Sequence, residues 1–166
     1  NRQLLFDQVL CLEQMITTGG GWQDQVGGLI GGIKLTRTTP GLPQAMQVER
    51  CQLSPQTLDA LSKRLMLVYT KQRRLAKNLL RSVMGRWMAR DPEMVSLLER
   101  IAELAELMHA SLARGDLDTF GKLLGQHWEI NKRMDPGSTN PFIDELLAFC
   151  APYITGAKLA GAGGGD

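Results

Sequence analysis

The sequence lacks an apolar run that approaches the roughly 18 residues of a membrane span, and its first residues show no signal-peptide pattern. Its formal net charge is only +2, which gives no electrostatic reason to expect nucleic acid or an anionic membrane as a partner. Three widely spaced cysteines argue against a disulfide framework and favour a reducing compartment. We therefore expect a cytoplasmic protein with neither a membrane nor a nucleic-acid partner.

Histidine is also scarce. His109 and His127 fall in helical patterns, and neither has an acidic residue or cysteine at metal-ligand spacing. The sequence shows no pattern typical of a Ser-His-Asp or Cys-His catalytic site. We expect two ordinary helix residues and predict no metal site. The 166 residues are otherwise unexceptional, with 43% hydrophobic and 22% charged side chains, as in a globular domain.

The spacing of apolar residues, together with the capping, proline and glycine residues between the apolar segments, predicts a helix-rich α+β protein. Cap-and-proline pairs open two helices, Ser54-Pro55 and Asp91-Pro92, while Gly115 closes the second and Asp116 caps the next. The expected helices cover residues 5–16, a short segment from 22, 54–63, 74–89, 91–114, 116–134 and 141–152. The expected strands are 31–39 and 44–53, which form a hairpin, the apolar run 64–70, and 156–161.

Two glycine runs are the most unusual features: "TTGGGWQDQVGG" (Thr17–Gly28) and "LAGAGGGD" (Leu159–Asp166). Successive glycine N–H groups can form a concave nest for phosphate, and a following helix N-terminus strengthens it. The alternative is that both are flexible connectors. Neither is a Walker A loop; the nearest attempt, Gly27 to Lys34, has the wrong spacing and no following Ser or Thr.

Asp24 is the only acid between Glu13 and Glu49. A carboxylate near a helix N-terminus stays ionised and can accept a hydroxyl proton, although a structural first-turn acid has the same spacing. The flanking Gln23 and Gln25 suit sugar hydroxyls. Further along, two residues share a helix face, Trp128 and Lys132; they could form a ligand-stacking pair or a core tryptophan beside a snorkelling lysine.

Several segments together resemble the GHMP sugar kinases. These are "TTGGGWQDQVGGLIGGIKL", "LMLVYTKQRRLAKNLL", "HWEINKRM" with "STNPFIDEL", and "AKLAGAGGG", in that order. Within the family the chain is most similar to the fucokinases, and next to the heptose-phosphate kinases. The resemblance implies that residues 1–50 finish the N-terminal lobe and that residues 51–166 form a ferredoxin-like C-terminal domain.

The resemblance also implies an activity: transfer of the γ-phosphoryl of ATP to a sugar hydroxyl, with L-fucose giving fucose 1-phosphate. Asp24 matches the base that accepts or orients the hydroxyl proton. Sugar contacts map to Gly20, Gly21, Gln23 and Gln25, and phosphate contacts map to Gly161, Gly163, Gly164 and Gly165. Arg74 and Lys132 are further candidates without a firm role.

The chain departs from the family pattern at several points. Lys71 and Asp166 stand where the family usually has glycine, and the upstream glycine-serine phosphate loop is absent. We therefore expect the main ligands of ATP and Mg²⁺ outside this chain, and a fragment that is inactive alone. A nucleotidyltransferase domain can be fused in such proteins. A heptose-phosphate kinase, or a non-catalytic sugar- or nucleotide-binding module on the same fold, remains open.

Overall fold

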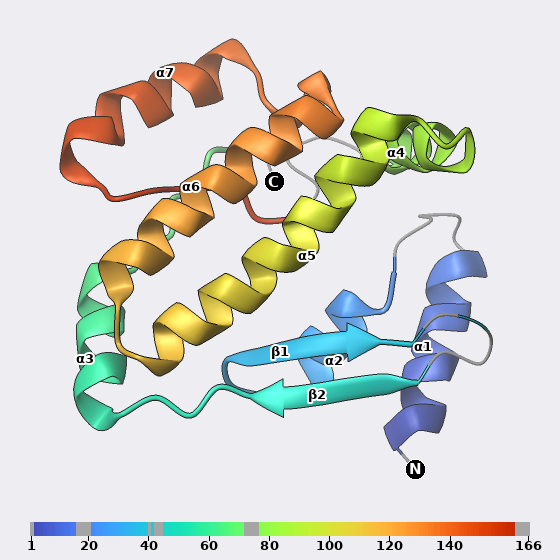
Figure 1. Cartoon of the computed structure of the whole chain (residues 1–166), viewed down its shortest axis with the longest axis horizontal. Coiled ribbons are helices and arrows are strands. Elements are labelled where there is room, and N and C mark those ends of the chain that lie inside the picture. The colour runs from blue at the N-terminus through green and yellow to red at the C-terminus, as the bar shows by residue number, and fades with distance from the viewer. Residues whose placement is uncertain (1, 16–20, 40, 42–44, 72–76, 162–166) are drawn as a thin grey trace. The chain divides into compact units, whose positions relative to one another are not determined.

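The computed structural model describes residues 2–15, 21–39, 41, 45–71 and 77–161 (Figure 1). The chain separates into two compact units, Asn1–Gln52 and Leu53–Asp166. Both contain helices, and the sheet lies in the first unit. None of the helices in the described ranges combines the length and the apolar character needed to cross a membrane.

The first unit contains α1 (Arg2–Met15), α2 (Gln23–Leu29) and an antiparallel hairpin of β1 (Lys34–Thr38) and β2 (Met46–Arg50). The hairpin register pairs Lys34 with Arg50 and Thr38 with Met46, which confirms the predicted pairing. β-branched residues favour both strands, and Gly41 in the connection has a φ of +96° that suits glycine.

A small apolar cluster holds the first unit together. Phe6, Val26 and Ile30 are buried, with Trp22, Met46 and Val48 packed against them. The helix α1 is where the sequence predicts one, but several of its apolar side chains are exposed: Leu5 is 44% exposed and Leu12 61%. Among the side chains of α1 that the structure describes, Phe6 is the buried one.

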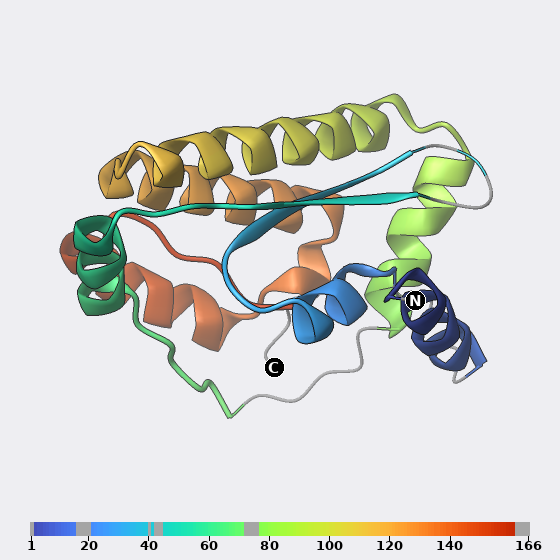
Figure 2. The ribbon, with the colours of Figure 1, turned by 90° about the horizontal axis from the view of Figure 1, so that it is seen from below.

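The second unit contains α3 (Pro55–Arg64), α4 (Lys77–Met88), α5 (Pro92–Ala113), α6 (Leu117–Met134) and α7 (Pro141–Cys150), with 3₁₀ turns η1 (Pro136–Ser138) and η2 (Ala151–Tyr153). Helices α5 and α6 run side by side as an antiparallel pair (Figures 1 and 2). Their shared core comprises Leu97, Leu104, Leu123 and Ile130, flanked by Ile101, Met108 and Met134.

The predicted helix caps are confirmed. Ser54 Oγ accepts a hydrogen bond from Thr57 N at 3.1 Å, and Asp91 Oδ1 accepts from Glu93 N at 3.0 Å. Asp116 Oδ1 accepts from Thr119 N at 3.0 Å and opens α6. Gly115, at φ +74°, closes α5 in the left-handed conformation that such a position favours. Local chemistry therefore fixes the bounds of α3, α5 and α6.

An arginine joins three elements at the corner between α4 and α5, which the sequence analysis did not anticipate. Arg86 Nε donates to Asp91 Oδ2 at 2.6 Å, and its Nη2 donates to Glu93 Oε2 at 3.2 Å. Its Nη1 donates to the carbonyl of Met134 at 3.2 Å, at the end of α6. The Arg86 hydrogen bond is the main reason why the pKa of Asp91 lies below its ordinary value.

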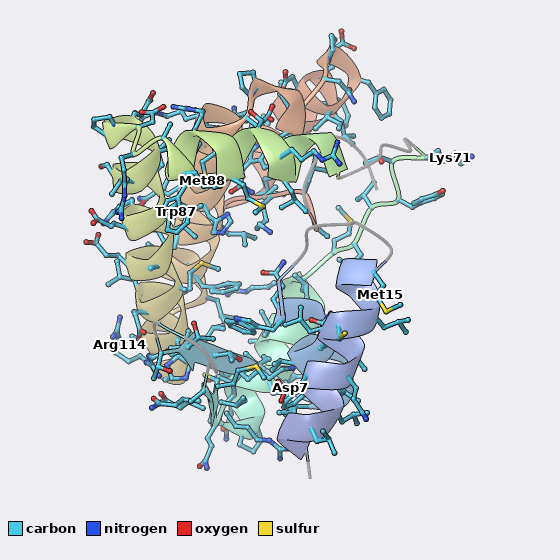
Figure 3. All side chains as sticks on the ribbon, turned by 90° about the vertical axis from the view of Figure 1, so that its right-hand side faces the viewer. Asp7, Met15, Lys71, Trp87, Met88 and Arg114 are labelled. Carbon is cyan, nitrogen blue, oxygen red and sulfur yellow. The ribbon has the colours of Figure 1, made fainter. Side chains whose placement is uncertain are left out.

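The strands predicted at 64–70 and 156–161 are wrong for the described chain, since neither segment is paired as a strand. A strand needs a neighbour for its backbone groups, and the ladder in the described ranges joins β1 to β2. The apolar run is instead open to solvent, with Leu67 89% and Tyr69 67% exposed. It ends at Lys71, whose φ of +58° lies in the left-handed region that glycine favours (Figure 3).

Candidate functional site

The first half of the candidate site is the start of α2. Asp24 is the second residue of this helix, and the structure describes its backbone only. The N-cap residue Trp22 makes no side-chain capping hydrogen bond, although its carbonyl accepts from Val26 N at 3.1 Å. Trp22 therefore does not cap the first-turn N–H groups with its side chain, and an acid or anion there is favoured by the helix dipole.

The residues around Asp24 divide into an exposed and a buried set. Gln23 is exposed, whereas Gln25 is only 6% exposed and belongs to the packed side of α2. Gly21 is exposed, and a Cβ there would meet nothing within 4 Å, so its backbone is open to close approach. Gly20 lies outside the described residues.

Lys34 closes the C-terminal end of α2. It is the lysine of the segment Gly27 to Lys34, whose spacing does not fit a Walker A loop. Its Nζ donates to the carbonyls of Gly27, Ile30 and Gly32. A lysine at a helix C-terminus satisfies carbonyls that lack intrahelical partners and interacts favourably with the helix dipole. Lys34 thus ties α2 to the start of β1, and its ammonium is committed to backbone oxygens.

The second half of the candidate site is the glycine motif that follows residue 160. Gly161 is exposed and has a φ of +65°, and a Cβ there would meet nothing within 4 Å. Gly163, Gly164 and Gly165 lie outside the described residues, as does Arg74. Asp24 and Gly161 belong to different units, so the structure describes each half of the candidate site separately.

Residues before the motif lie directly on α6. A Cβ on Gly156 would come within 1.9 Å of the Gly121 carbonyl oxygen and 3.1 Å of the Gly125 nitrogen. A Cβ on Gly121 would in turn lie 2.8 Å from Cβ of Thr155. The absence of a Cβ at Gly156 therefore permits a close backbone-to-backbone contact with α6, and Gly121 leaves room there for Thr155. The signal was present in the sequence, as small residues four apart in "GKLLG", but it was not recognised.

A cavity of about 230 Å³ adjoins this contact, between α6, α7 and residues 154–157. Trp128, Glu129 and Thr155 are among the residues in its wall. Trp128 is 3% exposed, and its Nε1 has no hydrogen-bond partner among the described residues. The ring is thus a core residue, as the more conservative interpretation expected. Lys132 extends from the same helix and pairs with Glu129 at 2.7 Å.

Two titratable groups near the contact are shifted by burial. Desolvation lowers the pKa of the Lys158 ammonium. Desolvation also lowers the pKa of His127, and the positive charge of Lys158 lowers it further. Within the described residues, no group of three His, Cys, Asp or Glu is placed to hold a metal ion.

A family model for the C-terminal domain of GHMP kinases matches residues 107–166, which comprise the last two turns of α5, all of α6 and α7, and the glycine motif. The Gly121–Gly125–Gly156 contact and the start of the glycine motif therefore lie within the matched residues. The helix-rich architecture with one small sheet agrees with the α+β class expected from the sequence.

Two curated relatives are similar over almost the whole chain. The bifunctional fucokinase/GDP-fucose pyrophosphorylase of Arabidopsis thaliana is 43% identical over 157 residues, which cover 95% of this chain and 15% of that protein. The L-fucokinase/L-fucose-1-P guanylyltransferase of Bacteroides fragilis is 35% identical over 162 residues, which cover 95% of this chain and 17% of that protein. The chain thus spans about a sixth of each relative. No solved structure matches it.

Proposed function

We propose that this chain is the C-terminal part of an ATP-dependent sugar kinase, and that the complete enzyme phosphorylates L-fucose to fucose 1-phosphate. The proposal rests on two alignments that each cover 95% of the chain. Both aligned proteins, one from a plant and one from a bacterium, have fucokinase in their names. The GHMP kinase C-terminal domain at residues 107–166 supports the same reaction class. A fused nucleotidyltransferase domain and a cytoplasmic location belong to this proposal.

The division of labour between the two halves follows from their chemistry. Asp24, in the first turn of α2, would accept or orient the proton of the attacking sugar hydroxyl, and the exposed Gln23 and Gly21 would border that sugar. The glycine motif would approach the phosphates with its backbone N–H groups, beginning at Gly161. ATP supplies the phosphoryl group, and the main ligands of ATP and Mg²⁺ would lie elsewhere in the enzyme.

The exposed, side-chain-free backbone at Gly161 fits close approach of a phosphate, since a Cβ there would meet nothing within 4 Å. The described residues do not provide a metal-ligating cluster, so no step of the reaction is assigned to a metal held by them. The ferredoxin-like arrangement of the C-terminal domain, with residues 1–50 completing the preceding lobe, is part of the proposal.

The decisive test is turnover by the full-length protein with and without the Asp24 carboxylate. Asp24→Asn should lower kcat by about 10²–10⁴, the usual effect of losing a general base. ADP release with L-fucose as acceptor measures it, and circular dichroism checks folding. Asp7→Asn is the matched control, because it removes an exposed acid from the same unit.

Three results would contradict the proposal. Near-normal turnover by Asp24→Asn would remove the assigned role of this residue. Faster turnover of a heptose phosphate than of L-fucose would change the substrate. Calorimetric binding of fucose or ATP by the intact protein without turnover would indicate a sensor on a kinase fold.

A further inference from the structure

Helix α2 carries Asp24 in its first turn, but it has little stability of its own. It has seven residues, and two of them, Gly27 and Gly28, are glycines, which are among the least favourable residues in a helix interior. Isolated helices shorter than about 12–15 residues are marginal in water even when they are rich in alanine. The orientation of α2, and with it the place of Asp24, therefore depends on contacts outside the helix.

One such contact is the packing of one side of α2. Val26 is 1% exposed and Ile30 8%, and both belong to the apolar cluster that contains Phe6 of α1. Apolar packing is not directional. It therefore restrains the direction of the helix axis less than a set of hydrogen bonds at one end of the helix does.

Lys34 supplies hydrogen bonds of this kind at the C-terminal end of α2. The Nζ of this half-buried side chain donates to the carbonyl of Gly27 at 3.5 Å and to the carbonyl of Ile30. The third acceptor is the carbonyl of Gly32, at 3.3 Å. An ammonium has three donors, so each of them has an acceptor here. One side chain thus joins the last turn of α2, the residue after the helix and the connection to β1.

The hairpin in turn fixes the position of Lys34. This residue is the first of β1 and pairs with Arg50 in the register of the two strands. Directly before it, the carbonyl of Ile33 accepts a hydrogen bond from Cys51 N at 2.9 Å. The ladder therefore holds the backbone of the lysine, and the ammonium of the lysine holds α2 on the hairpin.

We propose that Lys34 is a positioning residue for phosphoryl transfer: it fixes α2 on the hairpin and thereby holds Asp24 where the sugar hydroxyl is activated. This inference rests on the proposed function for the role of Asp24. Lys34 acts through Asp24 and not on the substrate, because its donors are committed to backbone carbonyls. A misplacement of about 1 Å at a reacting centre can cost about 10²-fold in rate, so a loosened α2 slows turnover even in a folded enzyme.

The test uses Lys34→Met in the full-length protein, because methionine keeps much of the apolar stem and removes the three donors. With ATP and L-fucose, kcat should fall about 10- to 100-fold, while KM for ATP stays unchanged. Circular dichroism at the assay temperature checks folding. Arg37→Met is the matched control and should leave kcat unchanged: it removes a cation from the same strand, one that pairs with Glu49 across the hairpin at 2.8 Å.

A double-mutant cycle separates positioning from a general loss of stability. If Lys34 acts through Asp24, the double variant Asp24→Asn/Lys34→Met should turn over no more slowly than Asp24→Asn alone. A further loss of about 10-fold in the double variant would overturn the inference. A lysine that only stabilises the unit would lower the melting temperature of Lys34→Met and leave the kcat of the folded variant unchanged, which would overturn it as well.

A measurement on the wild type covers the case in which Lys34→Met fails to fold. An amine that donates to three carbonyls reacts slowly with an acylating reagent, because its hydrogen bonds must first break. Mass spectrometry should therefore show that Lys34 is acylated more slowly than Lys63, whose side chain is 71% exposed. Equal rates at the two lysines would show that Lys34 does not hold α2.

Failure of this inference and failure of the proposed function give different results. Slow turnover by Asp24→Asn with normal turnover by Lys34→Met refutes the inference and keeps the proposed role of Asp24. Normal turnover by Asp24→Asn refutes that role and, with it, the positioning by Lys34. If both variants are slow with a sugar that the wild type prefers to L-fucose, the inference holds and the proposed substrate is wrong.

Discussion

The two units of the chain achieve their stability in different ways. In the second unit, α5 and α6 form an antiparallel pair whose bounds are set by local caps and whose core alternates between the two helices. In the first unit, the core consists of three buried residues, from α1, from α2 and from the position directly after α2, and most apolar side chains of α1 are exposed. Helices that are defined by local signals and share a long interface need few long-range contacts to fold. The stability of a small core, in contrast, depends on each of its residues.

The largest expected effect tests whether the two cores are independent. Leu104 is fully buried in α5, and Leu104→Ala should lower the free energy of unfolding of the second unit by about 2–5 kcal/mol. Val26 is 1% exposed in the first unit, and Val26→Ala should cost about 2 kcal/mol there, because fewer methyl groups are lost. Hydrogen exchange measured by mass spectrometry reports each unit separately.

Each of these variants should accelerate exchange in its own unit and leave the other near its wild-type rate. If either substitution loosens α2 and α6 to the same extent, the chain unfolds as one cooperative body. The contrast between the two units would then fail.

A smaller effect is expected from the glycine contact within the second unit. Gly156→Ala should destabilise by about 1–3 kcal/mol or more, because the obstructing atom is a backbone carbonyl oxygen that cannot rotate away. Gly125→Ala is the matched control: its Cβ would lie 3.8 Å from Cα of Gly156, an ordinary contact, and alanine favours the helix. Urea denaturation should therefore separate the two variants, and equal midpoints would show that the chain can move off α6.

The smallest effect concerns acid. Arg86 lowers the pKa of Asp91 below that of an unfolded aspartate, about 3.9, so the unfolded chain binds the proton more readily than the folded one. This contribution to stability is present above that pH and is lost as the pH falls through the lowered pKa. Urea unfolding midpoints measured from pH 7 to pH 2.5 test this contribution. In Arg86→Met, the midpoint should fall less steeply as the pH is lowered. The first unit should keep its exchange protection over the same interval.

The elements that could be predicted from the sequence are those with local signals. Ser54, Asp91, Gly115 and Asp116 mark helix ends by chemistry within a few residues, and the structure confirms them. The hairpin was predictable from two short strands and a turn between them. These signals need no knowledge of distant parts of the chain.

Features that depend on residues far apart could not be read in the same way. Arg86 reaches the carbonyl of Met134, 48 positions away, and Gly156 meets Gly121 across 35 positions. The run at 64–70 has the composition of a buried strand, but composition does not provide a neighbouring strand. In the candidate site, the role of Asp24 came from a motif order and stays a prediction, while Lys34 needed the fold to reveal its carbonyl partners.

The open apolar run has a practical consequence for handling this chain. Leu65 to Tyr69 present five consecutive apolar or aromatic side chains, each more than half exposed, without a charge or proline among them. Such a window is a template for intermolecular β-pairing, and the charged residues at its two ends, Arg64 and Lys71, act as gatekeepers against it. Concentration and salt, which screens those two charges, therefore govern how long the isolated chain stays dispersed.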